Sequence, residues 1–290
     1  MATIRELVEE GRRRLAGAVA DSPGREARLL LAAILNRDQM ALVAHDDDAV
    51  AAADRERFRE LVERRERGEP AAYLLGRKEF YGRDFVVDDR VLIPRPETEA
   101  VVEIALSLDL PAEARVVDVG TGSGAIALTL AAERPRWRLV ATDLSLGALA
   151  CARENRARLG LADRVGLVRG DLASAVAAEP LDLVVSNPPY VDPAEPELVA
   201  PDVRTYEPHL ALFAAEGGLA VVARLVAFAS ALREGAWLIS EFGFGQRDRV
   251  LALAAATPGL ELVEMRDDAA GIPRVVVFKR TGRRDAVRSF

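Results

Sequence analysis

The chain of 290 residues has one cysteine, Cys151, and two histidines, His45 and His209. One thiol cannot form a disulfide within the chain, and histidines without a second ligand at metal-binding spacing do not form a zinc site. We therefore predict neither a disulfide framework nor a bound metal. Cys151 lies in the helix-like run Ala-Leu-Ala-Cys-Ala-Arg, which favours a small buried hydrophobic residue over a nucleophile.

The sequence also lacks a long hydrophobic run and an excess of positive charge. No apolar stretch approaches the roughly 18 residues of a membrane span, and the start of the chain is unlike a secretory signal. We expect a cytoplasmic protein that does not contact a membrane. Residues 80–278 hold 19 basic and 29 acidic residues. Because nucleic acid is bound largely through cationic contacts to phosphates, we expect no direct nucleic-acid binding.

The residues that are present suffice for two packed parts. Half of them are hydrophobic and 29% are charged, as in a folded globular protein. In residues 1–70, apolar side chains recur at three- and four-residue steps, which predicts helices separated near 21–24 and 46–48. The last of these helices, Asp54 to Arg67, ends before Gly68. We predict a small helical bundle over residues 1–76, without a catalytic group of its own, that recognises the substrate.

The rest of the chain predicts an α/β fold. Phe80–Val87 and Val91–Ile93 indicate two short strands around a turn at residues 88–89, within a hairpin linker over 77–98. From Arg115 to residue 282, strands alternate with helices, which predicts a mostly parallel, seven-stranded sheet in a catalytic domain over 99–282. One edge strand is expected to be antiparallel, and 283–290 to be a flexible tail. The expected strands are 116–119, 139–142, 165–168, 181–185, 237–241, 260–265 and 275–278; the expected helices are 125–133, 146–159, 172–178, 219–233 and 246–256.

Two features at the ends of the first two strands predict a cofactor site. The run Asp118 to Gly124 contains three alternating glycines, which allow a tight turn and close approach of the backbone to a ligand. Asp143 ends the next strand, where a carboxylate can accept both hydroxyls of a ribose. Taken alone, the glycines also fit a dinucleotide-binding loop, and Asp143 could instead cap the following helix.

A third feature, Asn187-Pro188-Pro189-Tyr190, follows the fourth strand. The prolines make this segment rigid and extended, so carbonyls and the Asn187 amide face outward. The Asn187 side-chain oxygen and the Pro188 carbonyl can accept the hydrogens of a substrate NH2 group. Tyr190 provides a planar face against which a flat group can stack. We predict that this segment binds a planar nitrogen substrate.

Together these motifs resemble those of class I S-adenosylmethionine-dependent methyltransferases that act on planar nitrogen. Nearly the whole chain resembles the HemK/PrmC family, which methylates the glutamine of the Gly-Gly-Gln loop in class I peptide chain release factors. Further matches are Gly68–Gly76, Leu92–Glu99 and Tyr206–Pro208. The chain departs from the family pattern at Ala72, Glu97, Leu172 and 213–218.

The resemblance implies a Rossmann-like class I methyltransferase fold, S-adenosylmethionine as methyl donor and S-adenosylhomocysteine as product. It implies release factors as partners, and we expect a monomer. Arg95, Glu97 and Thr98 are expected to shape the wall beside the cofactor, and Leu172 to border the adenine. The implied catalytic residues are Asn187, Pro188 and Tyr190, with Pro189 joining them in substrate binding; the implied cofactor residues are Gly120, Thr121, Gly122, Ser123, Gly124, Asp143, Leu172 and Asn187.

Three alternatives remain at this point. An adenine-N6 DNA methyltransferase could use the same Asn187–Tyr190 site, but it would have to flip a base and hold phosphates. A nicotinamide-dependent oxidoreductase would explain the glycine loop but not Asn187–Tyr190. A non-enzymatic binding protein would leave the Asn187 segment without a use.

Overall fold

The computed structural model describes residues 2–17 and 22–282, and its contacts divide the chain into two compact units. The first unit contains the residues up to Arg77 together with Ala200–Tyr206, a segment that the sequence did not assign to it. The second contains Lys78–Val199 and the residues from Glu207 onward. The tail predicted at 283–290 lies outside the described residues.

The first unit is helical, as the apolar spacing predicts. Leu7, Leu30 and Phe58 are fully buried in its core. The first helix begins with a capping box, in which Thr3 accepts from the Glu6 N–H and Glu6 accepts from the Thr3 N–H. Its helices are α1 (Ile4–Leu15), α2 (Pro23–Leu35), α3 (Gln39–Ala44), α4 (Ala52–Glu66), α5 (Ala71–Leu75) and α9 (Pro201–Tyr206). The sequence did not predict α3, α5 and α9, which have only five or six residues each and so show little periodicity.

The second unit opens with a two-stranded hairpin whose turn lies elsewhere than predicted. The strands are β1 (Arg77–Phe80) and β2 (Arg83–Val86), and the turn residues Tyr81 and Gly82 both have positive φ. Two-residue hairpin loops favour this conformation because its twist matches that of the strands. A turn is present near the predicted residues 88–89, where the Val91 N–H donates to the Asp88 carbonyl at 3.1 Å, but it does not join two strands, and the strand predicted at 91–93 is absent.

A seven-stranded sheet forms the centre of the second unit, in the order β5-β4-β3-β6-β7-β9-β8. Neighbouring strands from β5 to β7 are parallel, whereas β9 is antiparallel to both of its neighbours. The predicted antiparallel strand is thus present but lies one position in from the edge, which is β8. The strands are β3 (Arg115–Val119), β4 (Arg138–Asp143), β5 (Val165–Arg169), β6 (Leu183–Ser186), β7 (Trp237–Glu241), β8 (Leu260–Asp267) and β9 (Pro273–Arg280).

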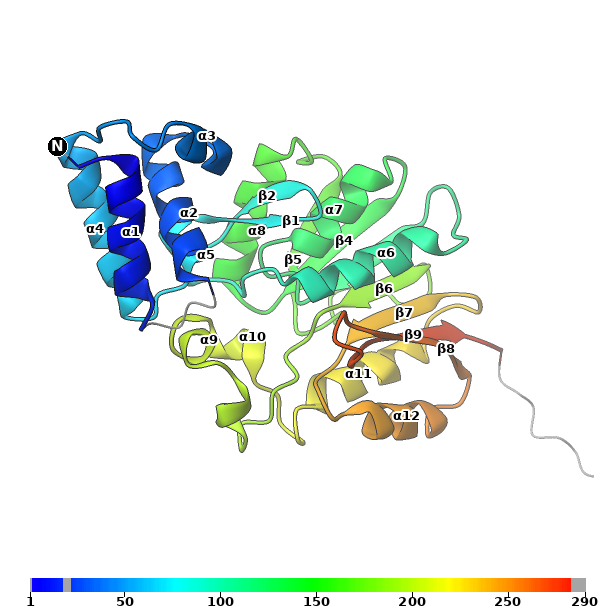
Figure 1. Ribbon diagram of the computed structural model, residues 1–290. Helices are drawn as coiled ribbons and strands as arrows, with labels where there is room; N and C mark the ends of the chain where they lie inside the picture. The colour runs from blue at the N-terminus through cyan, green and yellow to red at the C-terminus, as the bar shows by residue number, and fades with distance from the viewer. Residues whose placement is uncertain (1, 18–21, 283–290) are drawn as a thin grey trace, which may run out of the picture. The chain divides into compact units, whose positions relative to one another are not determined.

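Helices cover both faces of this sheet (Figure 1). Alternate residues of β3 illustrate the two layers, since Val116 packs with α6 and α7, whereas Val117 packs with α11 and α12. The helices of the second unit are α6 (Glu99–Ser107), α7 (Ala125–Glu133), α8 (Leu146–Arg158), α10 (His209–Leu212), α11 (Ala220–Ala229) and α12 (Arg247–Ala255), with 3₁₀ turns at Pro196–Leu198 and Pro96–Thr98. Helix α6 was not predicted, although its buried residues at 101, 102, 104 and 105 follow a helical spacing.

The helix predicted at 172–178 is absent, and this segment forms successive turns. Leu172 has a φ of 54°, in the left-handed region, which a right-handed helix cannot contain. Pro180 limits the segment on its other side. The few residues that remain are too short to offset the cost of starting a helix.

Candidate functional site

A cavity of about 300 Å³ opens at the carboxyl ends of β3, β4 and β6. The chain runs outward from β3 to β5 and then crosses to β6, so this is the switch point of the sheet, where ligands of such folds bind. Most of the predicted site residues meet here: Gly120, Thr121, Gly122, Ser123, Asp143, Leu172, Asn187 and Pro189 line the cavity. Gly124, Pro188 and Tyr190 are not among its lining residues.

The glycine loop is held by the main chain of the neighbouring strand. The N–H groups of Gly120 and Thr121 both donate to the Thr142 carbonyl at 2.9 Å. Gly120 and Gly122 have φ values of 72° and 56°, and a Cβ at either would meet no atom within 4 Å. These glycines are therefore required by backbone conformation, and the loop presents open backbone to the cavity.

Asp143 ties the end of β4 to this loop. Its Oδ2 accepts from the Gly122 N–H at 2.9 Å and its Oδ1 from the Ser145 N–H at 2.8 Å. Burial raises the pKa of Asp143, while these backbone hydrogen bonds lower it. The N-cap of α8 is Ser145, which accepts from Ala148, so capping this helix is not the role of Asp143.

Asp118, which the sequence placed in the glycine motif without a role, is fully buried beneath the loop. Its Oδ2 accepts from the Thr121 hydroxyl at 2.6 Å and the Ala127 N–H at 3.2 Å. Its Oδ1 has no hydrogen-bond partner among the described residues. Burial raises the pKa of Asp118 to about 7. Asp118 is thus a buried support of the loop and does not itself line the cavity.

The Asn187 side chain is held from the opposite side. Its Nδ2 donates to the Thr98 Oγ1 at 3.0 Å, and its Oδ1 accepts no hydrogen bond among the described residues. Ser186, the last residue of β6, is bonded to the neighbouring strand β3, because its hydroxyl donates to the Val119 carbonyl at 2.7 Å. Asn187 thus presents an oxygen acceptor in a cavity lined by the glycine loop.

Tyr190 is supported by two segments that sequence reasoning did not connect to it. The Gln246 side-chain amide donates to the Tyr190 carbonyl at 2.8 Å and accepts from the Gly243 N–H at 2.8 Å. At Gly218, a Cβ would lie only 2.0 Å from the Tyr190 carbonyl oxygen. Burial raises the pKa of the Tyr190 phenol to about 12, so the phenol remains protonated at neutral pH.

Of the three residues expected to shape the cofactor wall, only Thr98 lines the cavity. Arg95 instead donates to Glu207 at 2.5 Å, and Glu97 is exposed. Glu207 is buried and also accepts from the Ile93 N–H at 3.0 Å. This contact holds the segment before Thr98 in place, and it explains on physical grounds why the sequence has a glutamate at 207.

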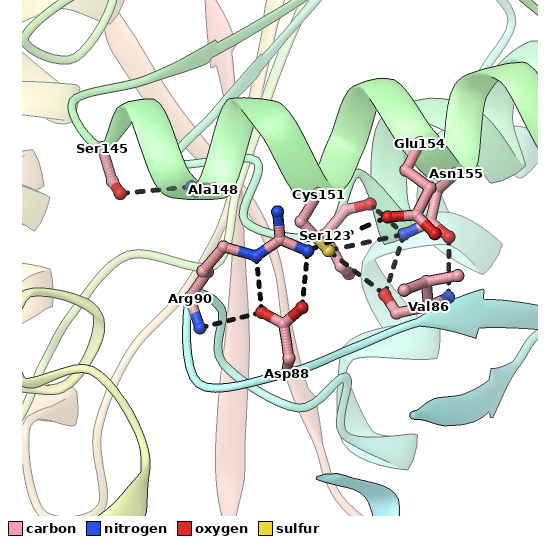
Figure 2. Close-up of polar contacts among 9 residues, drawn as sticks. All are labelled: Val86, Asp88, Arg90, Ser123, Ser145, Ala148, Cys151, Glu154 and Asn155. Carbon is pink, nitrogen blue, oxygen red and sulfur yellow. Dashed lines mark hydrogen bonds and ion pairs between the residues drawn. The ribbon is translucent and has the colours of Figure 1, made fainter. Parts of the chain in front are cut away.

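A buried asparagine links the hairpin to the glycine loop (Figure 2). Asn155 on α8 donates to the Val86 and Ser123 carbonyls, both at 2.9 Å, and its Oδ1 accepts from the Val86 N–H at 2.6 Å. Cys151, one turn earlier, is buried and its pKa is raised to about 12 by burial. The thiol is therefore not a nucleophile, as its sequence context predicts.

The sequence missed several lining residues. Apolar side chains around the cavity come from two remote segments, Val91–Pro94 and Leu210–Phe213. The first segment was expected to contain a strand and the second was given no role, so their adjacency to the cofactor residues was not foreseen. Asp171 was also missed, although it follows β5 at the same edge of the sheet as Asp143.

The described residues contain neither a helix able to span a membrane nor a cluster of metal ligands. No helix among 2–17 and 22–282 has both the length and the apolar character needed to cross a membrane. Within the same ranges, no cluster of three or more histidine, cysteine, aspartate or glutamate side chains is arranged to hold a metal ion.

Two family descriptions match the chain. Residues 6–76 match the PrmC N-terminal domain, and residues 101–228 match the methyltransferase small domain. Among similar proteins, the release factor glutamine methyltransferase of Nitratidesulfovibrio vulgaris is 42% identical and covers 96% of each chain. That of Koribacter versatilis is 40% identical and covers 96% of this chain and 99% of its own.

Solved structures with much lower identity share the fold. The hMettl16 catalytic domain, in complex with an RNA hairpin, superposes with a TM-score of 0.56 at 18% identity, covering 79% of this chain and 82% of its own. A methyltransferase from Pyrococcus furiosus superposes with a TM-score of 0.53 at 16% identity, covering 70% of this chain and 92% of its own. These similarities support the class I methyltransferase fold that the family resemblance implied.

Proposed function

The chain belongs to the family of release factor glutamine methyltransferases, and we propose that it methylates the side-chain amide nitrogen, N5, of a glutamine in peptide chain release factors. The acceptor is the glutamine of their Gly-Gly-Gln loop. The observation that carries the proposal is a single cavity that joins the glycine loop and Asp143 to the acceptor oxygen of Asn187.

The cavity fits S-adenosylmethionine as methyl donor. The donor's ribose hydroxyls need hydrogen-bond acceptors, and the Asp143 carboxyl lines the glycine-loop side of the cavity. Gly120–Ser123 would hold the donor through open backbone, and Leu172 would pack against its adenine. When bound, S-adenosylmethionine supplies an electrophilic methyl group on a sulfonium, so no metal is required.

The protein's own task is to position a poor nucleophile. A carboxamide nitrogen shares its lone pair with the carbonyl, so it must be aligned and its hydrogens accepted as positive charge develops. Asn187 Oδ1 and the Pro188 carbonyl would accept those hydrogens, and Pro189 and Tyr190 would pack against the amide plane. The protonated Tyr190 phenol does not act as a base at neutral pH.

We further propose a division of labour along the chain. Residues 1–76 would recognise the release factor, 77–98 would link the parts, and 99–282 would carry out methyl transfer. The match of residues 6–76 to the PrmC N-terminal domain supports this assignment. A substrate that works in translation also favours a cytoplasmic location. We propose a monomer, because one chain supplies every residue used here.

The test is a transfer assay with tritiated S-adenosylmethionine. The purified protein is offered a release factor, the same release factor with its Gly-Gly-Gln glutamine replaced by alanine, duplex DNA, or no acceptor. We expect label only in the unaltered release factor. Label in DNA would favour adenine-N6 methylation, the alternative that the relatives do not favour, and label in the alanine variant would place the acceptor elsewhere.

A further inference from the structure

Glu207 is a buried carboxylate whose contacts join two walls of the cavity. It is 3% exposed, and its oxygens accept from the Ile93 N–H at 3.0 Å and from Arg95 Nη2 at 2.5 Å. The segment that it holds lines the cavity at Pro94, and the segment that follows it lines the cavity at Pro208. Burying a carboxylate is costly unless it is paired and hydrogen-bonded, so these contacts keep Glu207 and both segments together.

The wall around Arg95 reaches Asn187 through Thr98. The Arg95 carbonyl accepts from the Thr98 N–H at 3.1 Å, which closes the 3₁₀ turn Pro96–Thr98. The Thr98 Oγ1 in turn accepts from Asn187 Nδ2 at 3.0 Å. Prolines on both sides of Arg95 lack an N–H, so the ion pair with Glu207 supplies an anchor where two main-chain donors are missing. The position of Thr98, and with it that of the Asn187 amide, therefore depends on Glu207.

The second wall reaches the other end of the Asn187–Tyr190 segment. The Val191 N–H donates to the Leu212 carbonyl at 2.9 Å, and the Ala214 N–H donates to the Val191 carbonyl at 2.9 Å. Val191 directly follows the Asn187–Tyr190 segment, and Leu212 follows Glu207 by five residues. The two ends of the Asn187–Tyr190 segment are thus held by two stretches of chain that meet at Glu207.

We propose that Glu207 is a positioning residue for methyl transfer, which joins the two supports of the Asn187–Tyr190 segment and so sets where the Asn187 oxygen meets the substrate amide. This inference rests on the proposed function of Asn187 as the acceptor for that amide. Glu207 does not itself line the cavity, so it acts only through the segments that it joins. Misplacing catalytic groups by about 1 Å can cost on the order of 10²-fold in rate, so loosening one support should be measurable in kcat.

The first experiment compares Glu207→Gln, Arg95→Gln and the double variant, measuring kcat for release factor methylation and the Kd of S-adenosylmethionine. Glutamine keeps the length of Glu207 but loses its charge, and its NH2 group opposes one of the two donors. We expect each single variant to lower kcat about tenfold and to raise Kd less than about threefold, because the glycine loop and Asp143 remain. The double variant should lose little more than either single variant, and losses that multiply would contradict a shared contact. Arg95 is partly exposed, so Arg95→Gln tests the contact even if Glu207→Gln does not fold.

Asp182→Asn is the matched control, because Asp182 has the same kinds of partner as Glu207. It is 6% exposed, accepts from the Arg115 N–H at 2.7 Å and pairs with the Arg233 guanidinium. It precedes β6, however, and so lies at the end of the sheet opposite the cavity. Both Glu207→Gln and Asp182→Asn should lower the melting temperature, but only Glu207→Gln should lower kcat at temperatures at which both variants remain folded.

A substrate-free measurement separates failure of the inference from failure of the proposed function. The side-chain NH2 signals of Asn187, identified in the ¹⁵N-labelled protein by their loss in Asn187→Ala, should move in Glu207→Gln and stay in place in Asp182→Asn. Unmoved signals in Glu207→Gln, a wild-type kcat in either single variant, or an equal fall in kcat for Asp182→Asn would overturn the positioning role. A wild type that leaves release factors unlabelled, while Glu207→Gln still moves these signals, would overturn the substrate assignment instead.

Discussion

The two halves of the cavity are built by different means. On the cofactor half, backbone groups hold the site, since Gly120 and Thr121 donate to the Thr142 carbonyl and Gly122 donates to Asp143. On the amide half, side chains from remote segments hold it: Asn187 donates to Thr98, and Gln246 donates to the Tyr190 carbonyl. The cofactor half is therefore a product of the strand–loop–helix fold itself, whereas the amide half depends on several long-range contacts.

Because of this difference, we expect substitutions in the two halves to have different consequences. Backbone hydrogen bonds survive most side-chain changes, so the cofactor half should lose affinity in small steps. The amide half presents few groups to the reacting nitrogen, and each depends on its support. Changes there should lower turnover steeply while leaving cofactor binding nearly intact.

The largest effect is expected for Asn187→Ala. The substitution removes the oxygen that accepts the substrate amide hydrogen, and loss of one such transition-state contact costs on the order of 10²–10³-fold in kcat. The Kd of S-adenosylmethionine, measured by calorimetry, should change by less than about threefold because the glycine loop and Asp143 remain. Methylation above about a fifth of the wild-type rate would contradict the role of Asn187. A large loss of cofactor affinity would show that the amide half also binds the cofactor, so the two halves would not differ as proposed.

The same difference decides what the sequence could predict. Gly120–Ser123 and Asp143 were correctly placed at one cavity because they follow consecutive strands, and the carboxyl ends of parallel strands share an edge. Asn187 was placed for the same reason. Its hydrogen-bond partner Thr98 lies 89 residues earlier in the chain, and no local sequence pattern predicts a contact over that separation. Thr98 was expected beside the cofactor and does line the cavity, but its hydrogen bond to Asn187 was not foreseen.

Errors in the fold have equally local causes. The run Phe80–Val87 was expected to form one strand, but positive φ at Tyr81 and Gly82 makes it the turn and second strand of a hairpin. The alanine-rich stretch after Leu172 has helical composition, yet the left-handed Leu172 prevents a helix from forming. Composition predicts which element a segment prefers, whereas single residues with unusual dihedral angles decide where it breaks.

The next largest effect is expected for Gly218→Ala. The added Cβ would lie 2.0 Å from the Tyr190 carbonyl oxygen, so the Asn187–Tyr190 segment must shift. Misplacing catalytic groups by about 1 Å can cost on the order of 10²-fold in rate. Steady-state assays at saturating S-adenosylmethionine should show this loss in kcat.

Gly235→Ala is the matched control for this substitution. Gly235 has a φ of 85°, close to the 80° of Gly218, but a Cβ there meets no atom within 4 Å. Both variants carry the conformational cost of a non-glycine residue at positive φ, about 1–2 kcal/mol, and only Gly218→Ala adds the clash. Equal losses of kcat in the two variants would attribute the effect to general destabilisation.

A smaller effect, on stability, is expected for Asn155→Ala. The substitution leaves the Val86 N–H and the Val86 and Ser123 carbonyls without this buried partner (Figure 2). Unmade buried hydrogen bonds cost about 1–3 kcal/mol each, so losing three should lower the free energy of unfolding in urea by at least about 3 kcal/mol. Asn155→Asp keeps the acceptor for the Val86 N–H but loses both donors, and it should remain destabilised. A variant as stable as wild type would show that the glycine loop needs no remote support.

The smallest effect is expected for Asp143→Asn, on the cofactor half. The asparagine side chain retains one oxygen acceptor, but it replaces charge-assisted hydrogen bonds by neutral ones, a difference of about 1–1.5 kcal/mol. The Kd of S-adenosylmethionine should rise about tenfold, with kcat at saturation unchanged, because this contact is made equally before and during reaction. Asp163→Asn, an exposed change at the turn before β5, controls for net charge and should leave Kd unaltered. A fall in kcat for Asp143→Asn would mean that the cofactor half also positions the reacting atoms. It would contradict the assignment of affinity to one half of the cavity and turnover to the other.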